Sequence, residues 1–239
     1  MILTEKNRIE AFTKKGWWGE DTLYSLFKDA LTSCGDQEAL VDPKNRADIT
    51  GDPPKRLSFN DIDKTVERYA SIFFEHGLRK DDIVIIQLPN IVELPMIYLA
   101  LSKLGIICSP IPMQYGVYEI TSIIAETQPK GFISIQSFNG NAHAEQFSSV
   151  FNNNELKFAL GAINNFVNLH EYSPADGSYE SHQSYVQANA VTANDIFTIC
   201  WTSGTTGTPK GVPRSHNLWL PMAKACLLYT SDAADEVDR

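Results

Sequence analysis

The feature that most constrains the fold is a regular alternation of apolar strands and helices in the middle of the chain. Residues 83–88, 106–111 and 131–135 are continuous apolar runs of strand length, and helical patterns over 92–104 and 117–127 separate them. Apolar runs of this kind are typical of strands buried on both faces, as in parallel sheets covered by their crossover helices. The pattern therefore predicts an open α/β sheet with right-handed crossovers.

Weaker patterns flank this core on both sides. Before it, we expect helices over 8–15, 22–32 and 60–75, a short strand over 39–42 and a loop over 43–54. After it, we expect a helix within 139–154, a short strand over 157–160, an irregular surface excursion over 161–189 and a strand over 195–201.

The composition is that of an ordinary globular protein, because 43% of the 239 residues are hydrophobic. The formal net charge of −9 argues against a nucleic-acid partner. The apolar runs are too short to cross a membrane, and the N-terminus has no apolar signal core. The four cysteines are widely spaced and form no C-x-x-C pair, which suggests a reducing compartment. Together these features predict a cytoplasmic protein without a transmembrane segment.

The strand over 195–201 leads directly into a run rich in glycine and hydroxyl groups, Thr202-Ser-Gly-Thr-Thr-Gly-Thr-Pro-Lys210-Gly211. Glycines let backbone N–H groups converge on one anion, and Lys210 supplies a mobile cation suited to phosphate. The run is not a Walker A loop, because Gly211 follows Lys210 where that motif needs Ser or Thr, and it is not G-x-G-x-x-G. A flexible linker is the alternative, which five hydroxyls, three glycines and one lysine disfavour. The run therefore predicts a phosphate site.

The run Thr202–Gly211 resembles the signature loop of the adenylate-forming superfamily, which includes acyl-CoA synthetases, aryl-acid AMP ligases, luciferases and peptide-synthetase adenylation domains. Residues 57–62 (LSFNDI), 87–93 (QLPNIVE) and 101–112 (LSKLGIICSPIP) are similar to further family elements in the expected order. The resemblance covers most of residues 8–225. It implies a partial N-terminal AMP-binding domain over 1–225, the parallel-sheet-containing first part of the large domain of such an enzyme, truncated.

The resemblance implies a two-step reaction. A carboxylic acid attacks the α-phosphorus of ATP to give an acyl-adenylate and pyrophosphate, and a thiol, often that of coenzyme A, then takes the acyl group. Mg²⁺ is expected to share the phosphate charge, with no metal ligand assigned within the chain. The implied nucleotide contacts are Thr202, Ser203, Gly204, Thr205, Thr206, Gly207 and Lys210.

His216 lies in the segment Pro213-Arg-Ser-His-Asn217, of a type that occurs in aryl- and acyl-activating members of the superfamily. It is a candidate contact near the nucleotide or the acyl group, and a purely structural histidine is the alternative. Trp17 and Trp18 resemble the start of some acyl-CoA and dihydroxybenzoate ligases, although core packing explains them as well. The resemblance places the catalytic residues beyond the chain end and most acid-selecting residues beyond position 225.

Three alternatives to an acyl-CoA ligase stay open. They are a siderophore-type aryl-acid AMP ligase, a peptide-synthetase adenylation domain and a non-catalytic nucleotide-binding module. Residues 226–239 do not continue the family pattern and look like the translation of a sequencing adaptor. We therefore expect a non-native tail there, which the nucleotide sequence at the 3′ end of the gene tests.

Overall fold

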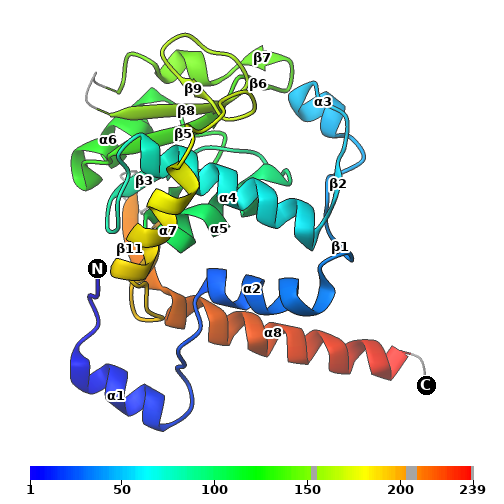
Figure 1. The fold of residues 1–239 in the computed structure, drawn as a ribbon, viewed down its shortest axis with the longest axis vertical. Coiled ribbons are helices and arrows are strands. Elements are labelled where there is room, and N and C mark those ends of the chain that lie inside the picture. Colours follow the sequence, from blue (N-terminus) through cyan, green and yellow to red (C-terminus); the bar gives the residue numbers. More distant parts are fainter. Residues whose placement is uncertain (152–154, 203–208, 238–239) are drawn as a thin grey trace.

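A seven-stranded, mostly parallel sheet forms the centre of the protein (Figure 1). The computed structural model describes residues 1–151, 155–202 and 209–237, with side chains in the last range as far as Leu227. All neighbouring strands are parallel except the pair at one edge, β11 and β10. The spatial order is β11 (Lys210–Ser215), β10 (Ile196–Thr202), β4 (Ile107–Pro110), β3 (Ile83–Ile86), β5 (Gly131–Ile135), β8 (Leu156–Leu160) and β9 (Val167–Asn168). The predicted α/β sheet is confirmed.

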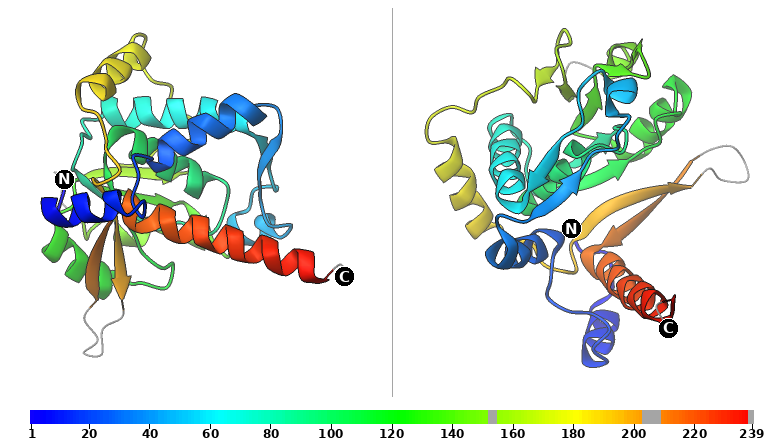
Figure 2. Two further views of the ribbon diagram at one scale, coloured as in Figure 1. Left: turned by 90° about the horizontal axis from the view of Figure 1, so that it is seen from below. Right: turned by 90° about the vertical axis from the view of Figure 1, so that its right-hand side faces the viewer.

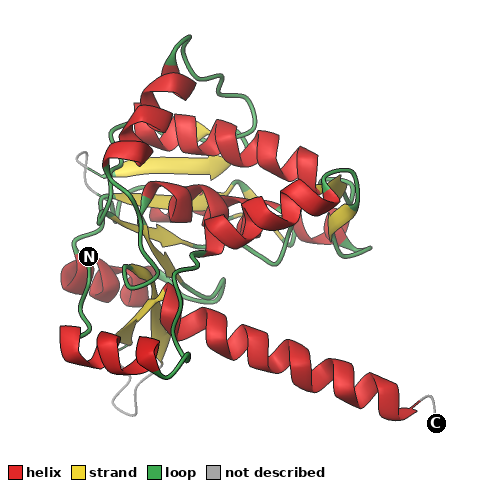
Figure 3. Cartoon of the chain, turned by 60° about the horizontal axis from the view of Figure 1, so that its bottom comes forward, coloured by secondary structure: helices red, strands yellow, loops and turns green. Residues whose placement is uncertain are grey.

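Helices cover both faces of this sheet, so its strands carry apolar side chains on both sides. On β3, Val84 and Ile86 belong to the larger core cluster and Ile85 belongs to the smaller one on the other face. The larger cluster lies under α2 (Leu23–Cys34), α4 (Phe59–Glu75), α5 (Glu93–Leu104) and α7 (Ser178–Ala188). The smaller one lies under α6 (Val117–Thr127) and the 3₁₀ turn η1 (Ala144–Phe147). Outside these layers, α1 (Lys6–Lys14) and α8 (His216–Val237) extend away from the sheet (Figures 1 and 3).

The longest helix of the covering layer, α4, has clear local signals. Ser58 caps its N-terminus, because the Ser58 hydroxyl accepts from the backbone N–H of Asp61 while the Asp61 carboxylate accepts from that of Ser58. Its buried residues recur at helical spacing, from Ile62 through Val66 and Tyr69 to Phe73. The helix ends two residues before Gly77, which has a φ of 92°.

Residues 43–54 were expected to be a loop, and that expectation was wrong for α3 (Arg46–Thr50). This helix lies between β1 (Glu38–Val41) and β2 (Arg56–Ser58), which pair antiparallel. The cause is a buried ion cluster. The two Nη groups of Arg46 donate to the carboxylate of Glu93, both over 2.8 Å, and Arg46 also pairs with Asp42. Lys55 Nζ donates to the same Glu93 over 2.6 Å. Tertiary ion pairs therefore hold a turn that local sequence does not favour.

The helix expected within 139–154 was also wrong, as far as residues 139–151 are described. Asn139 and Gly140 have φ values of 51° and 77° and form the turn of a small hairpin. Its strands are β6 (Ser137–Phe138) and β7 (Asn141–Ala142), and only η1 follows it as a helical turn. Asn-Gly is a strong hairpin signal, because both residues tolerate positive φ.

The irregular excursion expected over 161–189 contains α7, so this expectation was wrong for Ser178–Ala188. Its buried residues, Ser178 and His182, are polar, although Tyr185 also packs on Phe74 of α4. His182 is fully buried, with Nδ1 3.0 Å from the Ser71 hydroxyl and Nε2 3.2 Å from Glu67 Oε2. Apolar periodicity gives no signal for a helix anchored in this way.

Candidate functional site

The two strands that flank the predicted phosphate loop form a hairpin at the edge of the sheet. β10 and β11 pair antiparallel from Ile196 with Ser215 up to Thr202 with Lys210. In the described residues β10 pairs with β4 at Thr198 and Cys108, and the hairpin then diverges from the sheet (Figure 2). The sequence did not predict β11, whose Pro213 fits an edge strand because proline cannot donate to a ladder.

Of the eight predicted site residues, three lie in the described part of the chain. Ser203, Gly204, Thr205, Thr206 and Gly207 lie outside the described residues. Thr202 and Lys210 face each other as the last pair of the hairpin, where the Thr202 hydroxyl donates to the Lys210 carbonyl over 3.5 Å. The structure thus brings the two described ends of the predicted loop together.

Lys210 is exposed at this hairpin end. In the residues that the structure describes, no carboxylate lies within ion-pair distance of its ammonium group. An unpaired, mobile lysine is a point charge suited to phosphate oxygens. Lys210 therefore keeps its positive charge available for an anion.

Packing on the sheet fixes the base of the hairpin. The indole N–H of Trp201 donates to the Ser109 hydroxyl of β4 over 2.8 Å. A Cβ on Gly211 would lie 3.0 Å from Cη2 of Trp201 and 2.9 Å from Cγ2 of Ile199. Gly211 therefore gives the indole ring of Trp201 room beside β11 and so supports the position of Lys210.

His216 lies at the opposite end of β11 from the predicted loop. It lies six steps of mostly extended chain from Lys210, a path of about 20 Å. The His216 ring is 2% exposed and stacks on Phe197, with ring centroids 4.9 Å apart. Its Nδ1 accepts a hydrogen bond of 3.2 Å from the backbone N–H of Leu23. The structure therefore does not bring His216 to the hairpin end that carries Lys210.

The neighbour of His216 explains part of the Pro213–Asn217 segment. Asn217 accepts from the backbone N–H of Gly19 and donates to its carbonyl, both over 3.0 Å. This clamp joins the start of α8 to the N-terminal segment, where Trp18 is buried and packs edge-on against Phe12, whereas Trp17 is exposed. Packing thus accounts for Trp18, in line with the structural alternative.

A crevice opens beside the hairpin at the carboxyl ends of the parallel strands. β3 leads to β4 on one side, and the chain then crosses to β5 on the other side of β3, so the strand order reverses there. Open α/β sheets bind ligands at such switch points. The crevice has a volume of about 580 Å³, and residues that follow β3, β4 and β5 line it together with Cys200 and Trp201 of β10. We call it the switch-point pocket.

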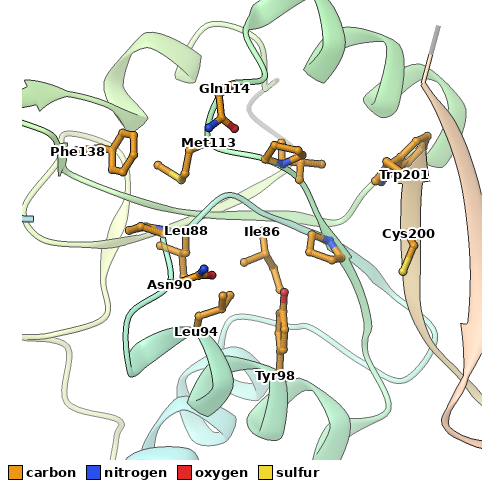
Figure 4. A pocket seen from close by; sticks show the side chains of 14 residues that line it. Ile86, Leu88, Asn90, Leu94, Tyr98, Met113, Gln114, Phe138, Cys200 and Trp201 are labelled. Atoms are coloured by element: carbon orange, nitrogen blue, oxygen red, sulfur yellow. The ribbon is translucent and has the colours of Figure 1, made fainter. Parts of the chain in front are cut away.

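The lining of the switch-point pocket is apolar with a few neutral polar groups (Figure 4). None of the 14 described residues that line it carries a charge. The Tyr98 hydroxyl points into the cavity, and the amides of Asn90 and Gln114 lie at its border (Figure 4). Burial raises the pKa of Tyr98, so its hydroxyl stays protonated at neutral pH. The pocket suits an uncharged, apolar group.

The switch-point pocket was not predicted as a site from the sequence. Its signal was present, because residues 87–93 and 101–112 contain turns that directly follow predicted apolar strands. Gln87 fixes one of these turns by donating to the carbonyls of Pro112 and Tyr115, both over 3.0 Å. Which turns meet depends on the strand order, and the residues alone do not give this order.

Comparison with known proteins identifies the family. The family model described as "AMP-binding enzyme" matches residues 27–239. The chain therefore belongs to the AMP-binding enzyme family. Its relatives include acyl-CoA ligases and aryl-acid AMP ligases, as the resemblance implied.

Several curated relatives match most of this chain. Pseudomonine synthase PmsE of Pseudomonas entomophila is 27% identical over 225 residues, which are 92% of this chain and 34% of that protein. The medium-chain fatty-acid–CoA ligase of Escherichia coli K12 is 23% identical, over 92% of this chain and 37% of its own length. The 2,3-dihydroxybenzoate-AMP ligase of Bacillus subtilis is 24% identical, over 87% and 36%. The chain thus spans about a third of the length of these relatives.

Solved structures show the same fold. The apo structure of Mycobacterium smegmatis MbtA aligns with a TM-score of 0.72 at 19% identity, covering 91% of this chain and 38% of that one. A long-chain-fatty-acid–CoA ligase from Archaeoglobus fulgidus aligns with a TM-score of 0.63 at 19% identity, covering 83% of this chain and 37% of that one.

Among the helices that the structure describes, none has the length and apolar composition of a membrane span.

Proposed function

We propose that the complete protein uses ATP to convert a carboxylic acid into an acyl-adenylate and then transfers the acyl group to the thiol of coenzyme A. The ligase class follows from membership of the AMP-binding enzyme family. The observation that carries the proposal for this chain is the position of Lys210. It is exposed and unpaired, among the described residues, at the end of the β10–β11 hairpin beside the switch-point pocket.

Lys210 and the switch-point pocket would bind different parts of the two substrates. The Lys210 ammonium group would hold the β- and γ-phosphates and stabilise the charge of the departing pyrophosphate. The neutral groups of the switch-point pocket would surround an apolar part of the acid. Because none of the described residues that line that pocket is charged, the reacting carboxylate would lie outside it, toward the nucleotide.

The family implies ATP and Mg²⁺, and coenzyme A is used by some of its members. Lys210 fits the phosphate end of ATP, because its ammonium group is exposed and has no carboxylate partner among the described residues. The Thr202 hydroxyl donates to the Lys210 carbonyl and would have to turn to reach a phosphate oxygen. Mg²⁺ neutralises phosphate charge when it is bound. In the part of the chain that the structure describes, no group of three or more His, Cys, Asp or Glu side chains could hold a metal ion. The proposal names no Mg²⁺ ligand within this chain, and a cytoplasmic location is part of the proposal.

The main alternative to an acyl-CoA ligase is an aryl-acid AMP ligase, which differs in the acceptor of the acyl group. One relative favours that alternative by its name, the 2,3-dihydroxybenzoate-AMP ligase. The acid-dependent exchange of pyrophosphate into ATP should be measured with the full-length protein across aliphatic and aryl acids, followed by a product assay with coenzyme A.

The proposal expects exchange with at least one class of acid and conversion of that acid to its coenzyme A thioester. Exchange without formation of the thioester would support the activation step but contradict coenzyme A as the acceptor, as expected for an AMP ligase. A folded full-length protein that exchanges with no acid would contradict the activation itself and favour a nucleotide-binding module. We expect residues 1–239 alone to show no exchange.

A further inference from the structure

A second cavity lies near the other end of β10, away from Lys210. It has a volume of about 280 Å³, and we call it the His216 pocket. The start of α2, α5, β10 and the first two turns of α8 enclose it. Tyr98 and Pro110 line both this cavity and the switch-point pocket, so the two are neighbours. Its further apolar walls are Leu23, Phe197, Leu220 and Ala223.

The hydrogen bonds around the His216 pocket leave the Nε2–H of His216 unused. The Thr198 hydroxyl accepts from the indole N–H of Trp219 over 2.7 Å. The Nδ1 atom of His216 accepts from the backbone of Leu23, so the ring proton lies on Nε2. Among the described residues the Nε2–H of His216 has no hydrogen-bond partner, although the residue is only 2% exposed.

The His216 ring is neutral at physiological pH. Burial lowers the pKa of His216 to about 4, and the nearby Asp195 carboxylate offsets only part of this effect. No Asp, Glu, Lys or Arg is among the described residues that line the cavity. A buried water needs two to four polar partners. Among the described lining residues, the Thr198 hydroxyl already bonds to Trp219 and the Tyr98 hydroxyl points into the switch-point pocket, so water is a poor occupant. An anion is equally poor, because no cation would balance its charge.

We propose that the His216 pocket binds a small neutral molecule that has an apolar ring and one hydrogen-bond acceptor. The acceptor, such as a carbonyl oxygen, takes the Nε2–H of His216, and the ring lies among Phe197, Tyr98 and the first turns of α8. The site is separate from the phosphate end of the hairpin, and the proposed ligase function does not require it. The small volume restricts the ligand to about one ring, because most ligand pockets are about 300–1,000 Å³.

Two probes of nearly the same shape test the donor. Acetophenone carries a carbonyl oxygen where isopropylbenzene carries a methyl group. Both should shift the indole N–H resonance of Trp219, which lines the His216 pocket, more than that of Trp201 in the switch-point pocket. Acetophenone should bind about two- to tenfold tighter, the range expected for one net hydrogen bond. Equal affinities, or shifts at Trp201 instead of Trp219, would overturn the proposal.

Three variants separate binding from folding. His216→Phe keeps a ring to stack on Phe197 and removes the donor, so the preference for acetophenone should disappear. Ala223→Phe fills the cavity from the exposed side of α8 without touching a buried hydrogen bond, so neither probe should bind. Met222→Phe, at the neighbouring exposed position outside the cavity, should leave both affinities unchanged. A preference that survives His216→Phe, or binding that survives Ala223→Phe, would show that the site is wrong.

Discussion

At the residue scale, Gly211 shows that a signature glycine can be required for packing as well as for backbone freedom. From the sequence, unusual backbone angles were the expected reason for the glycines of this run. Gly211 is not among the glycines with positive φ, and its missing Cβ leaves space for Trp201 and Ile199. The residue type was therefore predictable, but its reason depends on the β10–β11 register, which no local pattern gives.

Gly211→Ala should destabilise the protein by about 1–3 kcal/mol, the usual cost of overpacking. The added methyl group would displace the Trp201 ring and weaken its hydrogen bond to Ser109. Urea unfolding followed by circular dichroism measures the change in unfolding free energy.

The matched control is Gly19→Ala, because a Cβ at Gly19 meets nothing within 4 Å. That variant should stay within about 0.5 kcal/mol of the native protein, as surface substitutions usually do. If Gly211→Ala were as mild as Gly19→Ala, the packing explanation for Gly211 would be wrong.

His216 illustrates the other limit of residue-level prediction. Its place in the Pro213–Asn217 segment, of a type that occurs in aryl- and acyl-activating members, made it a candidate contact near the nucleotide or the acyl group, and it lies six positions after Lys210. Because the intervening residues form an extended strand, those six positions become a separation of about 20 Å. Its candidacy as a nucleotide contact stays a prediction, and its observed contacts with Leu23 and Phe197 favour a structural or separate binding role.

At the element scale, apolar strands and helices were predictable and elements fixed by polar contacts were not. The strands β3, β4 and β5 and the helices between them lie where the apolar patterns place them. The helix α7 was missed because its buried face carries His182, whose partners come from α4. The β6–β7 hairpin was missed although Asn139-Gly140 is a recognisable turn signal.

Glu67 on α4 joins the elements around α7 and should make stability depend on pH. Lys103 of α5 donates to Glu67 Oε1 over 2.6 Å, and Tyr24 of α2 donates to the same atom over 2.9 Å. Burial alone would raise the pKa of Glu67, but the hydrogen bonds from His182 and Lys103 outweigh it and lower this pKa to about 2. Burial also lowers the pKa of Lys103, so the pair stabilises less than its geometry suggests.

Glu67→Gln should lower the unfolding free energy at pH 7 by about 2–4 kcal/mol, because it leaves the Lys103 cation buried without its counter-charge. A carboxyl group with a lowered pKa stabilises the fold above its unfolded pKa, near 4.5, and loses that contribution as the pH falls through about 2. The difference between native protein and variant should therefore be constant above pH 5 and shrink toward pH 2, in urea titrations at each pH.

Glu38→Gln provides the control for that titration. Glu38 pairs with Arg56 at the surface, where both side chains are largely exposed. An exposed pair is worth at most about 1 kcal/mol, so this variant should change stability little. A Glu67→Gln difference that stayed constant from pH 7 to pH 2 would exclude the charged network as its cause.

At the scale of the whole molecule, the strand order turns separate motifs into one site. The reversal beside β3 brings the turns after β3 and β4 to the same crevice, and β10 adds Cys200 and Trp201 from more than 80 residues further along the chain. The sequence predicted the α/β class and the family. It did not predict the strand order, because that order depends on which crossovers pass over β3. The expectation that residues 226–239 are a non-native tail stays a prediction, with α8 running from His216 to Val237.

The central claim is that the β10–β11 hairpin presents Lys210 to the phosphates of ATP. Its most direct test is the acid-dependent ATP–pyrophosphate exchange of the full-length protein with Lys210→Ala, compared with Lys224→Ala. Lys224 is also an exposed lysine, but it lies on α8 and pairs with Asp21 over 2.8 Å. Lys210→Ala should raise the barrier to exchange by about 1–3 kcal/mol, the range of a charged hydrogen bond, and Lys224→Ala should not change it. An unchanged exchange rate in Lys210→Ala would contradict the claim.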